Sequence, residues 1–374
     1  MIIGIDIRVL AIGRKSGVQE YAIEIISRLV RLSPQDEFKP FFSSFGRQLP
    51  EYDWLKLQNV KVYRYRFPNR LFFVVARLFG WPKLDKLMGG ADVFFSPHFF
   101  LAPLSPGCRR VTVFHDLSYE RFPEFFTWPQ RLWHRLMEPR KPARFSDRVI
   151  AVSASTKADL VKYYGLDPAN ISVIHNASSL LRPSEAALKH FKQLNHVPNR
   201  FVFSLGTLEP RKNIAGLIRA FNILRSKPEF GDLKLILAGT KGWKYSDVFN
   251  EMKDSPYSKD IIYLGYIEDS RAYYYSLASV FVYPSFFEGF GLPVLEAMSC
   301  GTPVVTSANS SMPEVAGDAA LLIDPYNISA IASAMESLLS DPELSALMKE
   351  KGMERSIRFD WDRAAEETLK VIHS

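Results

Sequence analysis

Two glutamates flank a glycine-rich turn within residues 285–305, where a predicted strand is followed by a predicted helix. Gly289 and Gly291 lie in this turn, between Glu288 and Glu296. Glycines let a ligand approach the backbone, and the unpaired N–H groups at a helix start attract an anion. A phosphate bound there would have a carboxylate on each side, able to accept hydrogen bonds from hydroxyls. The spacing suits a ribose on one side and a sugar on the other. The alternative to a ligand-binding turn is a surface loop in which a glutamate only complements the helix dipole.

Two cations follow a predicted strand at 201–205, within the sequence Gly-Thr-Leu-Glu-Pro-Arg-Lys-Asn at 206–213. Arg211 and Lys212 stand at the strand end and directly before a predicted helix. Cations at a helix start oppose the helix dipole, so an anionic ligand explains them better than solvent does. Arginine and lysine side chains neutralise diphosphates well, whereas a solvated Arg-Lys pair is the plainer interpretation.

Three further residues in the first half of the chain are candidates for a ligand-binding site. His115 and Ser153 each follow an apolar predicted strand, and Gly17 lies in the loop that enters the first predicted helix. A histidine at a strand end is often structural. Ser153 fits a helix N-cap as well as it fits a ligand-binding residue.

Short β-rich runs alternate with longer helical runs along the whole chain. Strands are predicted at 2–7, 60–65, 93–95, 111–114, 148–152 and 171–174 in the first half, and at 201–205, 233–237, 261–264, 280–282, 303–306 and 320–323 in the second. Helices are predicted, among others, at 18–32, 156–164, 214–224, 269–278 and 292–300. Apolar strands between amphipathic helices predict an α/β fold whose parallel sheets are covered on both faces.

An irregular stretch at 179–199, which contains two prolines, divides the predicted elements into two doubly wound domains. Residues 1–178 form the predicted N-terminal Rossmann-like domain, and residues 200–357 form the C-terminal one. Such domains bind ligands at the carboxyl ends of their strands, so two facing domains would enclose a cleft there.

The stretch 285–305 resembles the signature of the retaining GT-B glycosyltransferases of family 4, also called glycosyl transferases group 1. In that family two glutamates with seven residues between them bracket a nucleotide sugar, and Glu288 and Glu296 have this spacing. The resemblance implies that Glu288 meets the donor sugar and Glu296 the ribose hydroxyls. It places the acceptor on the N-terminal domain and the nucleotide sugar on the C-terminal domain, with a last helix at 358–374 that crosses back to the first. The resemblance also implies that Gly289, Phe290, Gly291 and Leu292 belong to the nucleotide-sugar site.

Other segments carry the same resemblance. In these enzymes the arginine and lysine that match Arg211 and Lys212 bind the donor diphosphate, beside the residues that match Gly206 and Thr207. Many relatives have an arginine in place of Thr207, so Arg211 is expected to supply the guanidinium. His115 is expected in the catalytic centre, where it would hold a sugar hydroxyl or the backbone near the reacting carbon without acting as a general base.

The loop around Gly17 resembles a family loop close to the diphosphate and acceptor. Relatives commonly have two adjacent glycines there, whereas this chain has Ser16 before Gly17. Ser153 is also similar to a family residue at the cleft end of a strand.

The reaction implied is transfer of a hexose from a nucleoside diphosphate to an acceptor hydroxyl with the anomeric configuration kept. The segment 206–213 resembles that of bacterial mannosyltransferases that build surface polysaccharide such as O-antigen. GDP-mannose is therefore the expected donor, and a lipid-linked or growing oligosaccharide the expected acceptor. Three alternatives stay open: transfer from UDP-glucose or UDP-N-acetylglucosamine, a GT-B sugar-nucleotide epimerase, and a non-catalytic protein that binds nucleic acid or an anionic surface.

No metal or other cofactor is expected. The one Asp-x-Asp motif, which in GT-A enzymes holds a divalent metal, stands at 360–362 in the terminal helical region, away from any predicted strand end. The chain has no His-Glu-x-x-His, Walker or Gly-x-Gly-x-x-Gly motif. Arg211, Lys212 and helix dipoles would then stabilise the leaving diphosphate. Two cysteines, Cys108 and Cys300, are too few for a cysteine zinc cluster.

Lysine and arginine outnumber the acids by 47 to 40, which favours acidic partners such as phosphates or anionic lipid. Cations and aromatic residues interleave at 61–86 and at 128–144, and this pattern suits contact of the first domain with an anionic membrane. Aromatic core residues with solvated cations, or a single-stranded nucleic acid, would also fit. The sequence has no signal-peptide pattern and no apolar run of about 18 residues. We therefore expect a cytoplasmic protein, peripheral on the inner face of the membrane, with no nucleic-acid partner.

Overall fold

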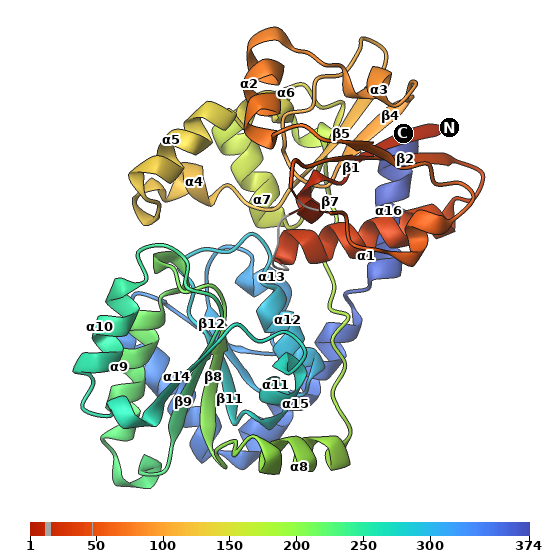
Figure 1. Ribbon diagram of the computed structural model, residues 1–374. Coiled ribbons are helices and arrows are strands. Elements are labelled where there is room, and N and C mark those ends of the chain that lie inside the picture. Colours follow the sequence, from red (N-terminus) through yellow and green to blue (C-terminus); the bar gives the residue numbers. More distant parts are fainter. Residues whose placement is uncertain (12–15, 47) are drawn as a thin grey trace. The chain divides into compact units, whose positions relative to one another are not determined.

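The computed structural model describes residues 1–11, 16–46 and 48–374, and the chain divides into two compact units (Figure 1). The first unit comprises Met1–Glu120, Trp128–Asn176 and Asp360–Ser374. The second comprises Arg121–Thr127 and Ala177–Phe359. The chain therefore enters the second unit briefly at Arg121–Thr127 before it does so for good at Ala177.

The described residues of the first unit form a parallel sheet in the order β3-β2-β1-β4-β5-β6-β7. Its strands are β1 (Ile2–Asp6), β2 (Glu37–Ser43), β3 (Tyr63–Tyr65), β4 (Val93–Ser96), β5 (Arg109–Phe114), β6 (Arg148–Ala151) and β7 (Ile171–Val173). The strand predicted at 60–65 begins only at Tyr63. Strand β2 was not predicted, because Pro40 and two charged residues interrupt its apolar pattern. Lys39 is nevertheless buried there, with its ammonium donating to the Gly90 carbonyl at 3.0 Å.

The helices of the first unit begin with α1 (Gly17–Leu32). It is followed by α2 (Asn69–Phe79), α3 (Leu84–Leu87), α4 (Ser118–Arg121, whose last residue belongs to the second unit), α5 (Trp128–Met137), α6 (Arg140–Arg144) and α7 (Ala154–Asp159). The helix predicted at 156–164 is α7 continued by a π-helical turn at Leu160–Tyr164.

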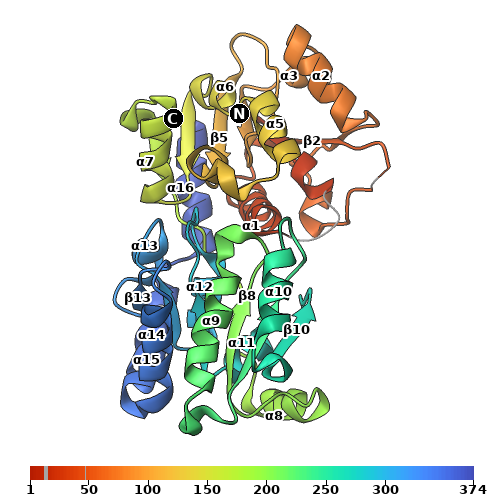
Figure 2. The same ribbon diagram turned by 90° about the vertical axis from the view of Figure 1, so that its left-hand side faces the viewer.

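The last helix, α16 (Trp361–His373), packs against α1 within the first unit (Figures 1 and 2). Arg28 pairs with Asp362 at 2.5 Å, and the rings of Tyr21 and Trp361 lie 6.0 Å apart in an edge-on arrangement. The end of the chain is thus part of the first unit, although 183 residues of the second unit (Ala177–Phe359) precede it.

The second unit contains a parallel sheet in the order β10-β9-β8-β11-β12-β13 over its described residues. Its strands are β8 (Phe201–Leu205), β9 (Lys234–Ala238), β10 (Ile261–Gly265), β11 (Val280–Tyr283), β12 (Val304–Ser307) and β13 (Leu321–Ile323). The helices are α8 (Glu185–Leu194), α9 (Ile214–Arg225), α10 (Ser246–Asp254), α11 (Arg271–Leu277), α12 (Leu292–Ser299), α13 (Met312–Ala316), α14 (Ile328–Ser340) and α15 (Pro342–Ile357). The two parallel sheets confirm the predicted Rossmann-like fold class.

Helices cover both faces of the second sheet, with α9, α10 and α14 on one face and α11 and α12 on the other (Figure 1). The apolar residues of α9 recur at helical spacing, for example at Ile214, Leu217 and Ile218, and are buried against the strands. The strands are apolar on both faces, as a sheet between two helical layers requires.

A close backbone approach joins the carboxyl ends of β8 and β9. Gly239 follows β9 with φ +134°, and a Cβ atom on it would lie 1.9 Å from the Gly206 carbonyl oxygen. Gly206 in turn donates its N–H to the Ala238 carbonyl at 2.9 Å. Only glycine fits at position 239, because both the backbone angle and the neighbouring chain exclude a side chain.

We predict that Gly239→Ala destabilises the fold by more than about 3 kcal/mol, since the new methyl group meets fixed backbone. Gly265→Ala is the matched control: Gly265 has φ +75°, but nothing lies within 4 Å of the position of its Cβ. Its cost should be only about 1–2 kcal/mol, the penalty of the left-handed conformation. Urea unfolding of both variants measures the difference, and equal losses would show that the contact with Gly206 does not matter.

Candidate functional site

The loop between β11 and α12 carries Glu288 and Gly289 and is held by hydroxyl groups from the segment that follows β12. Ser311 Oγ donates to the carbonyls of Glu288 at 3.0 Å and Phe290 at 2.7 Å. The N–H of Glu288 donates to Ser310 Oγ at 3.2 Å. The backbone that bears the carboxylate is therefore fixed on both sides of Glu288.

Gly291 makes the turn from this loop into α12. It has φ +108°, and a Cβ atom there would lie 2.2 Å from Met312 Cε. Leu292 begins the helix, and Phe290 is buried with its ring 5.7 Å from that of Phe359. The first N–H groups of a helix have no partner within the helix, so this start suits an anion, as the sequence predicts.

Arg211 and Lys212 both reach Glu288. The Arg211 Nη1 donates to Glu288 Oε2 at 2.6 Å and to the Phe287 carbonyl at 2.8 Å. The Lys212 Nζ donates to Glu288 Oε1 at 2.6 Å and to the Tyr283 hydroxyl. The structure thus brings together three residues that the sequence predicts for one site, at the carboxyl ends of the adjacent strands β8 and β11.

The contacts of Glu288 with Arg211 and Lys212 determine whether its carboxyl group is ionised. Burial by itself raises the pKa of Glu288, but Arg211 and Lys212 outweigh it and lower that pKa to about 2. Burial, together with repulsion from Arg211, lowers the pKa of Lys212, while Glu288 and Glu209 act to raise it. Burial raises the pKa of Tyr283 well above its usual value, and Glu288 adds to this effect. At neutral pH Glu288 is therefore an ionised hydrogen-bond acceptor.

Glu209 completes this group, although no sequence pattern singled it out. Its carboxylate is 3% exposed and accepts hydrogen bonds from Arg211 Nε at 3.1 Å and Nη2 at 2.7 Å. Glu209 and Arg211 stand two positions apart in the sequence, but the intervening Pro210 gives no sign that their side chains meet.

Glu296 has separate partners, both on α11. Its Oε2 accepts from the Tyr275 hydroxyl at 2.9 Å, and its Oε1 pairs with Arg271 Nη1 at 2.9 Å. The side chain is 2% exposed, and burial, with Glu296 beside it, raises the pKa of Tyr275 well above its usual value. An ionised carboxylate accepts hydrogen bonds, so Glu296 stays chemically suited to the ribose contact that the sequence predicts.

Gly206 and Thr207 lie where β8 ends. A Cβ atom on Gly206 would lie 3.7 Å from Lys212 Cε, and Thr207 Oγ1 lies 3.5 Å from Thr240 Oγ1. Gly206 therefore packs directly beside the lysine of the site.

The segment Arg121–Thr127 packs on the Glu288 loop within the second unit. The rings of Phe122 and Phe287 lie 5.6 Å apart, as do those of Phe125 and Phe286. The Trp243 indole N–H donates to the Phe125 carbonyl at 2.7 Å. Aromatic packing from a distant segment thus supports the two residues that precede Glu288.

In the first unit, His115 follows β5 and is held by its neighbours. Its Nε2 lies 2.8 Å from the Pro97 carbonyl oxygen, and its ring meets Tyr21 edge-on at 4.9 Å. Burial lowers the pKa of His115, against the raising effects of the Pro97 carbonyl and Asp116. A neutral ring that donates Nε2–H to Pro97 leaves Nδ1 as a hydrogen-bond acceptor.

Ser153 and Gly17 stand at helix starts. Ser153 Oγ accepts the Thr156 N–H at 3.0 Å and is the N-cap of α7, so the capping alternative describes its contacts. Gly17 is the first residue of α1, which Ser16 caps together with Gln19. The start of the predicted loop, at Lys15, lies outside the described residues. A ligand-binding role for Ser153 and Gly17 stays a prediction.

The described residues contain no group of three or more His, Cys, Asp or Glu side chains placed to hold a metal ion. At 360–362, Asp360 caps α16 by accepting the Asp362 N–H at 2.7 Å, and Asp362 pairs with Arg28. Across the described ranges, no helix has both the length and the apolar character needed to cross a membrane.

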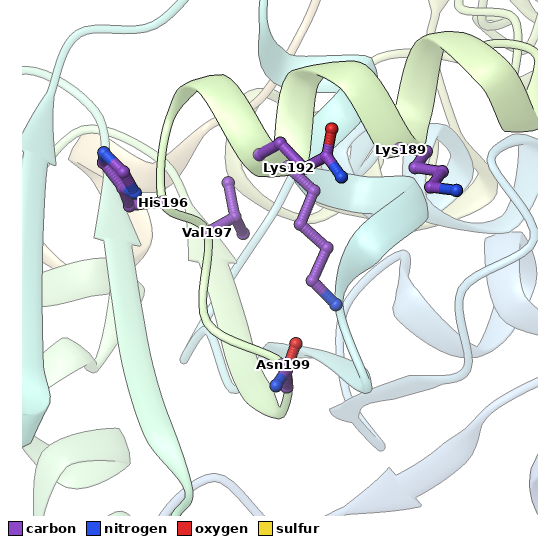
Figure 3. A pocket seen from close by; sticks show the side chains of 6 residues that line it. Lys189, Lys192, His196, Val197 and Asn199 are labelled. Atoms are coloured by element: carbon purple, nitrogen blue, oxygen red, sulfur yellow. The ribbon is translucent and has the colours of Figure 1, made fainter.

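An open depression of about 540 Å³ lies beside α8 and the turn that leads from it to β8 (Figure 3). It is lined by Lys189, Lys192, Gln193, His196, Val197 and Asn199. None of these residues is Glu209, Arg211, Lys212 or Glu288, so the depression forms no part of the carboxylate–cation group.

Two family models match the chain, one for each sheet. "Glycosyltransferase Family 4" matches residues 15–180, and "Glycosyl transferases group 1" matches residues 187–355. The chain is 28% identical to O-antigen chain mannosyltransferase B of Escherichia coli, over 95% of each chain. It is 27% identical to the serotype-specific mannosyltransferase WbdA of Escherichia coli over 69% of its own length, which is 32% of that protein.

Among solved structures, sucrose-phosphate synthase from Thermosynechococcus elongatus superposes with a TM-score of 0.77 at 21% identity, over 99% of this chain and 98% of that one. Both sheets are therefore shared with a known two-domain fold. The family models account for both halves of the chain, and the Glu288 and Glu296 pair lies within the second match. The chain belongs to glycosyltransferase family 4, glycosyl transferases group 1, and is a glycosyltransferase of the GT-B fold.

Proposed function

We propose that the protein is a retaining hexosyltransferase that moves mannose from GDP-mannose to a hydroxyl of a lipid-linked or growing oligosaccharide during synthesis of bacterial surface polysaccharide. The observation that carries the proposal is the joining of Glu288 to Arg211 and Lys212 beside the start of α12. The names of the relatives, which are O-antigen and serotype-specific mannosyltransferases, support the choice of sugar and of pathway class.

In the proposed reaction, Arg211, Lys212 and the N–H groups at the start of α12 bind the donor diphosphate. Arg211 and Lys212 supply two positive charges, and helix N–H groups add partial ones, so the charge that develops on the leaving oxygen has partners without a metal ion. Glu288 accepts from hydroxyls of the donor sugar, and Glu296 accepts from the ribose. The acceptor attacks on the face that the diphosphate leaves, and the leaving phosphate oxygen takes the proton of the acceptor hydroxyl.

His115 binds a sugar hydroxyl in this proposal. Its Nε2–H is directed at the Pro97 carbonyl, so Nδ1 is the atom that accepts the hydroxyl hydrogen. The lowered pKa keeps the ring neutral at neutral pH, which preserves that acceptor.

Nucleotide binding tests the donor. We expect GDP and GDP-mannose to raise the midpoint of thermal unfolding in the presence of EDTA, because ligands that bind only the folded state stabilise it. A ligand at about 100 times its dissociation constant adds about 2.7 kcal/mol to the stability. UDP, UDP-glucose and UDP-N-acetylglucosamine serve as the comparison. A shift with uridine nucleotides alone would replace mannose as the donor sugar, and a shift that EDTA abolishes would contradict metal-independent binding.

Replacement of Glu288 tests the site. Glu288→Gln should lower kcat by about 100-fold or more, because the amide removes the negative charge that pairs with Lys212 and with Nη1 of Arg211 and weakens the sugar contact. The exposed Glu350 on α15 offers the matched control, and Glu350→Gln should leave kcat unchanged. Initial rates of sugar release or transfer measure both. A Glu288→Gln enzyme with wild-type kcat would exclude Glu288 from the reaction.

The lowered pKa of Glu288 also has a consequence for stability. Its ionisation stabilises the folded state fully above its ordinary pKa of 4.5, and this contribution fades as the pH falls toward about 2. The stability advantage of the wild type over Glu288→Gln should therefore be largest near pH 6 and shrink below pH 4.5. Urea unfolding of both proteins at a series of pH values measures it, and an advantage that grows on acidification would contradict the assigned pairing.

We further propose that the protein is cytoplasmic and attaches peripherally to anionic membrane through α2 and α5 of the first unit. Large apolar side chains are exposed here, with Phe79 75%, Trp81 63% and Trp128 73% accessible. The rings of Phe73 and Trp133, 5.2 Å apart, join the two helices. Exposed cations on and beside these helices complement anionic lipid, namely Lys86, Arg131, Arg135, Arg140 and Lys141.

Liposome flotation tests the attachment. We expect binding to vesicles that contain anionic lipid at low salt, weaker binding at high salt, and little binding to neutral vesicles. The double variant Leu78→Ser, Phe79→Ser should bind less. Leu181→Ser is the control, because Leu181 is 81% exposed but lies outside α2 and α5. Absence of wild-type binding to anionic vesicles at low salt would overturn the proposed attachment.

A further inference from the structure

Glu209 is a buried carboxylate that accepts two hydrogen bonds from Arg211. The residue stands at the N-cap position of the short 3-10 helix Pro210–Lys212, in extended backbone with φ −144° and ψ 156°, and its side chain makes no capping hydrogen bond. Both hydrogen bonds from Arg211, at 2.7 and 3.1 Å, reach the same oxygen, Oε1. A carboxylate taken out of water is costly unless it is paired, so its place beside Arg211 is a specific arrangement.

The two carboxylates hold the guanidinium of Arg211 from different sides. Glu209 engages Nε and Nη2, whereas Glu288 and the Phe287 carbonyl engage Nη1. An arginine side chain has about 2 kcal/mol of rotamer entropy to lose when it is fixed, and a planar fork held at both edges has lost it before any ligand binds. Arg211 is therefore preorganised.

In the proposed function Glu288 cannot remain the partner of Arg211 in the same way, because Glu288 turns its acceptor oxygens to the donor sugar while the diphosphate takes the cations. Glu209 then holds the Nε and Nη2 edge of Arg211, beside the Phe287 carbonyl at Nη1. Glu209 thus supports Arg211 from the segment that follows β8, without a contribution from the loop that bears Glu288.

We propose that Glu209 is a positioning residue for the donor diphosphate, which holds the Arg211 guanidinium at the end of β8 independently of Glu288. This inference rests on the proposed function, since it assumes that Arg211 binds the diphosphate. Glu209 acts through Arg211 and has no contact of its own with the reacting atoms.

Two replacements of Glu209 by side chains of similar size distinguish a role in positioning Arg211 from a role of the negative charge. Glu209→Gln keeps an acceptor oxygen at the place of Oε1, whereas Glu209→Met fills the same space without one. Calorimetric titration with GDP and with UDP at neutral pH should give dissociation constants within about threefold of wild type for Gln and raised by about tenfold or more for Met. In steady-state assays, KM for the nucleotide sugar should rise more than kcat falls.

A double-mutant cycle tests whether Glu209 works through Arg211. Arg211→Ala should weaken nucleotide binding, and Glu209→Met should add little in that background. The pair Arg219–Glu251, which joins α9 to α10 at 2.7 Å, is the control, and Glu251→Met should leave nucleotide affinity unchanged. Thermal unfolding of each variant separates a loss of stability from a loss of affinity.

The outcomes distinguish the two proposals. Wild-type protein that binds neither GDP nor UDP would overturn the proposed function and this inference together. Normal wild-type binding with equal losses in Glu209→Gln and Glu209→Met would show that the charge matters and would overturn positioning alone. Additive effects in the cycle, or unchanged affinity in Glu209→Met, would do the same.

Discussion

Burial of the Glu288 carboxylate between Arg211 and Lys212 joins segments that lie 76 and 77 positions apart in the chain. Removal of one partner from a buried ion pair typically costs about 3–5 kcal/mol, because a charge is left without compensation. The pairing exists only because β8 and β11 are adjacent and in register, as Val202 and Phe203 beside Val280 and Phe281 show. The order of the strands in this sheet and the pairing of the charged side chains therefore depend on each other.

The backbone around this group has little freedom. Gly239 packs on Gly206 at the end of β8, and Gly291 packs on Met312 at the start of α12. Hydroxyls of Ser310 and Ser311 fix the loop between them. The group formed by Glu209, Arg211, Lys212 and Glu288 contains two carboxylates and two cations, so its charges balance before a ligand arrives. In the proposed function a diphosphate competes with Glu288 for the same donors, and this competition would couple donor binding to the position of the carboxylate.

Much of this arrangement could be predicted from local sequence, since the apolar strands, the turn at Gly289 and Gly291 and the cations after β8 are each visible within a few residues. Strand β2 could not, because Pro40 and Lys39 break its pattern and the buried Lys39 ammonium has its hydrogen-bond acceptor, the Gly90 carbonyl, 51 positions away in the chain. The partners of Glu296, namely Arg271 and Tyr275, come from a neighbouring helix, and their pairing follows from helix packing that no spacing encodes. Glu209 was missed for a related reason, since its role depends on where its side chain points.

The segment Arg121–Thr127, which belongs to the second unit, limits how the protein can be divided into fragments that each contain one unit. Neither unit is a continuous stretch, because the second takes in these seven residues and the first takes in Asp360–Ser374. A fragment cut at Ala177 and Phe359 would lose the rings of Phe122 and Phe125 and expose those of Phe286, Phe287 and Trp243. Removal of the first unit would thus take an apolar cover away from the loop next to Glu288. The second unit therefore needs residues 121–127 attached to it to keep this surface covered when it is expressed by itself.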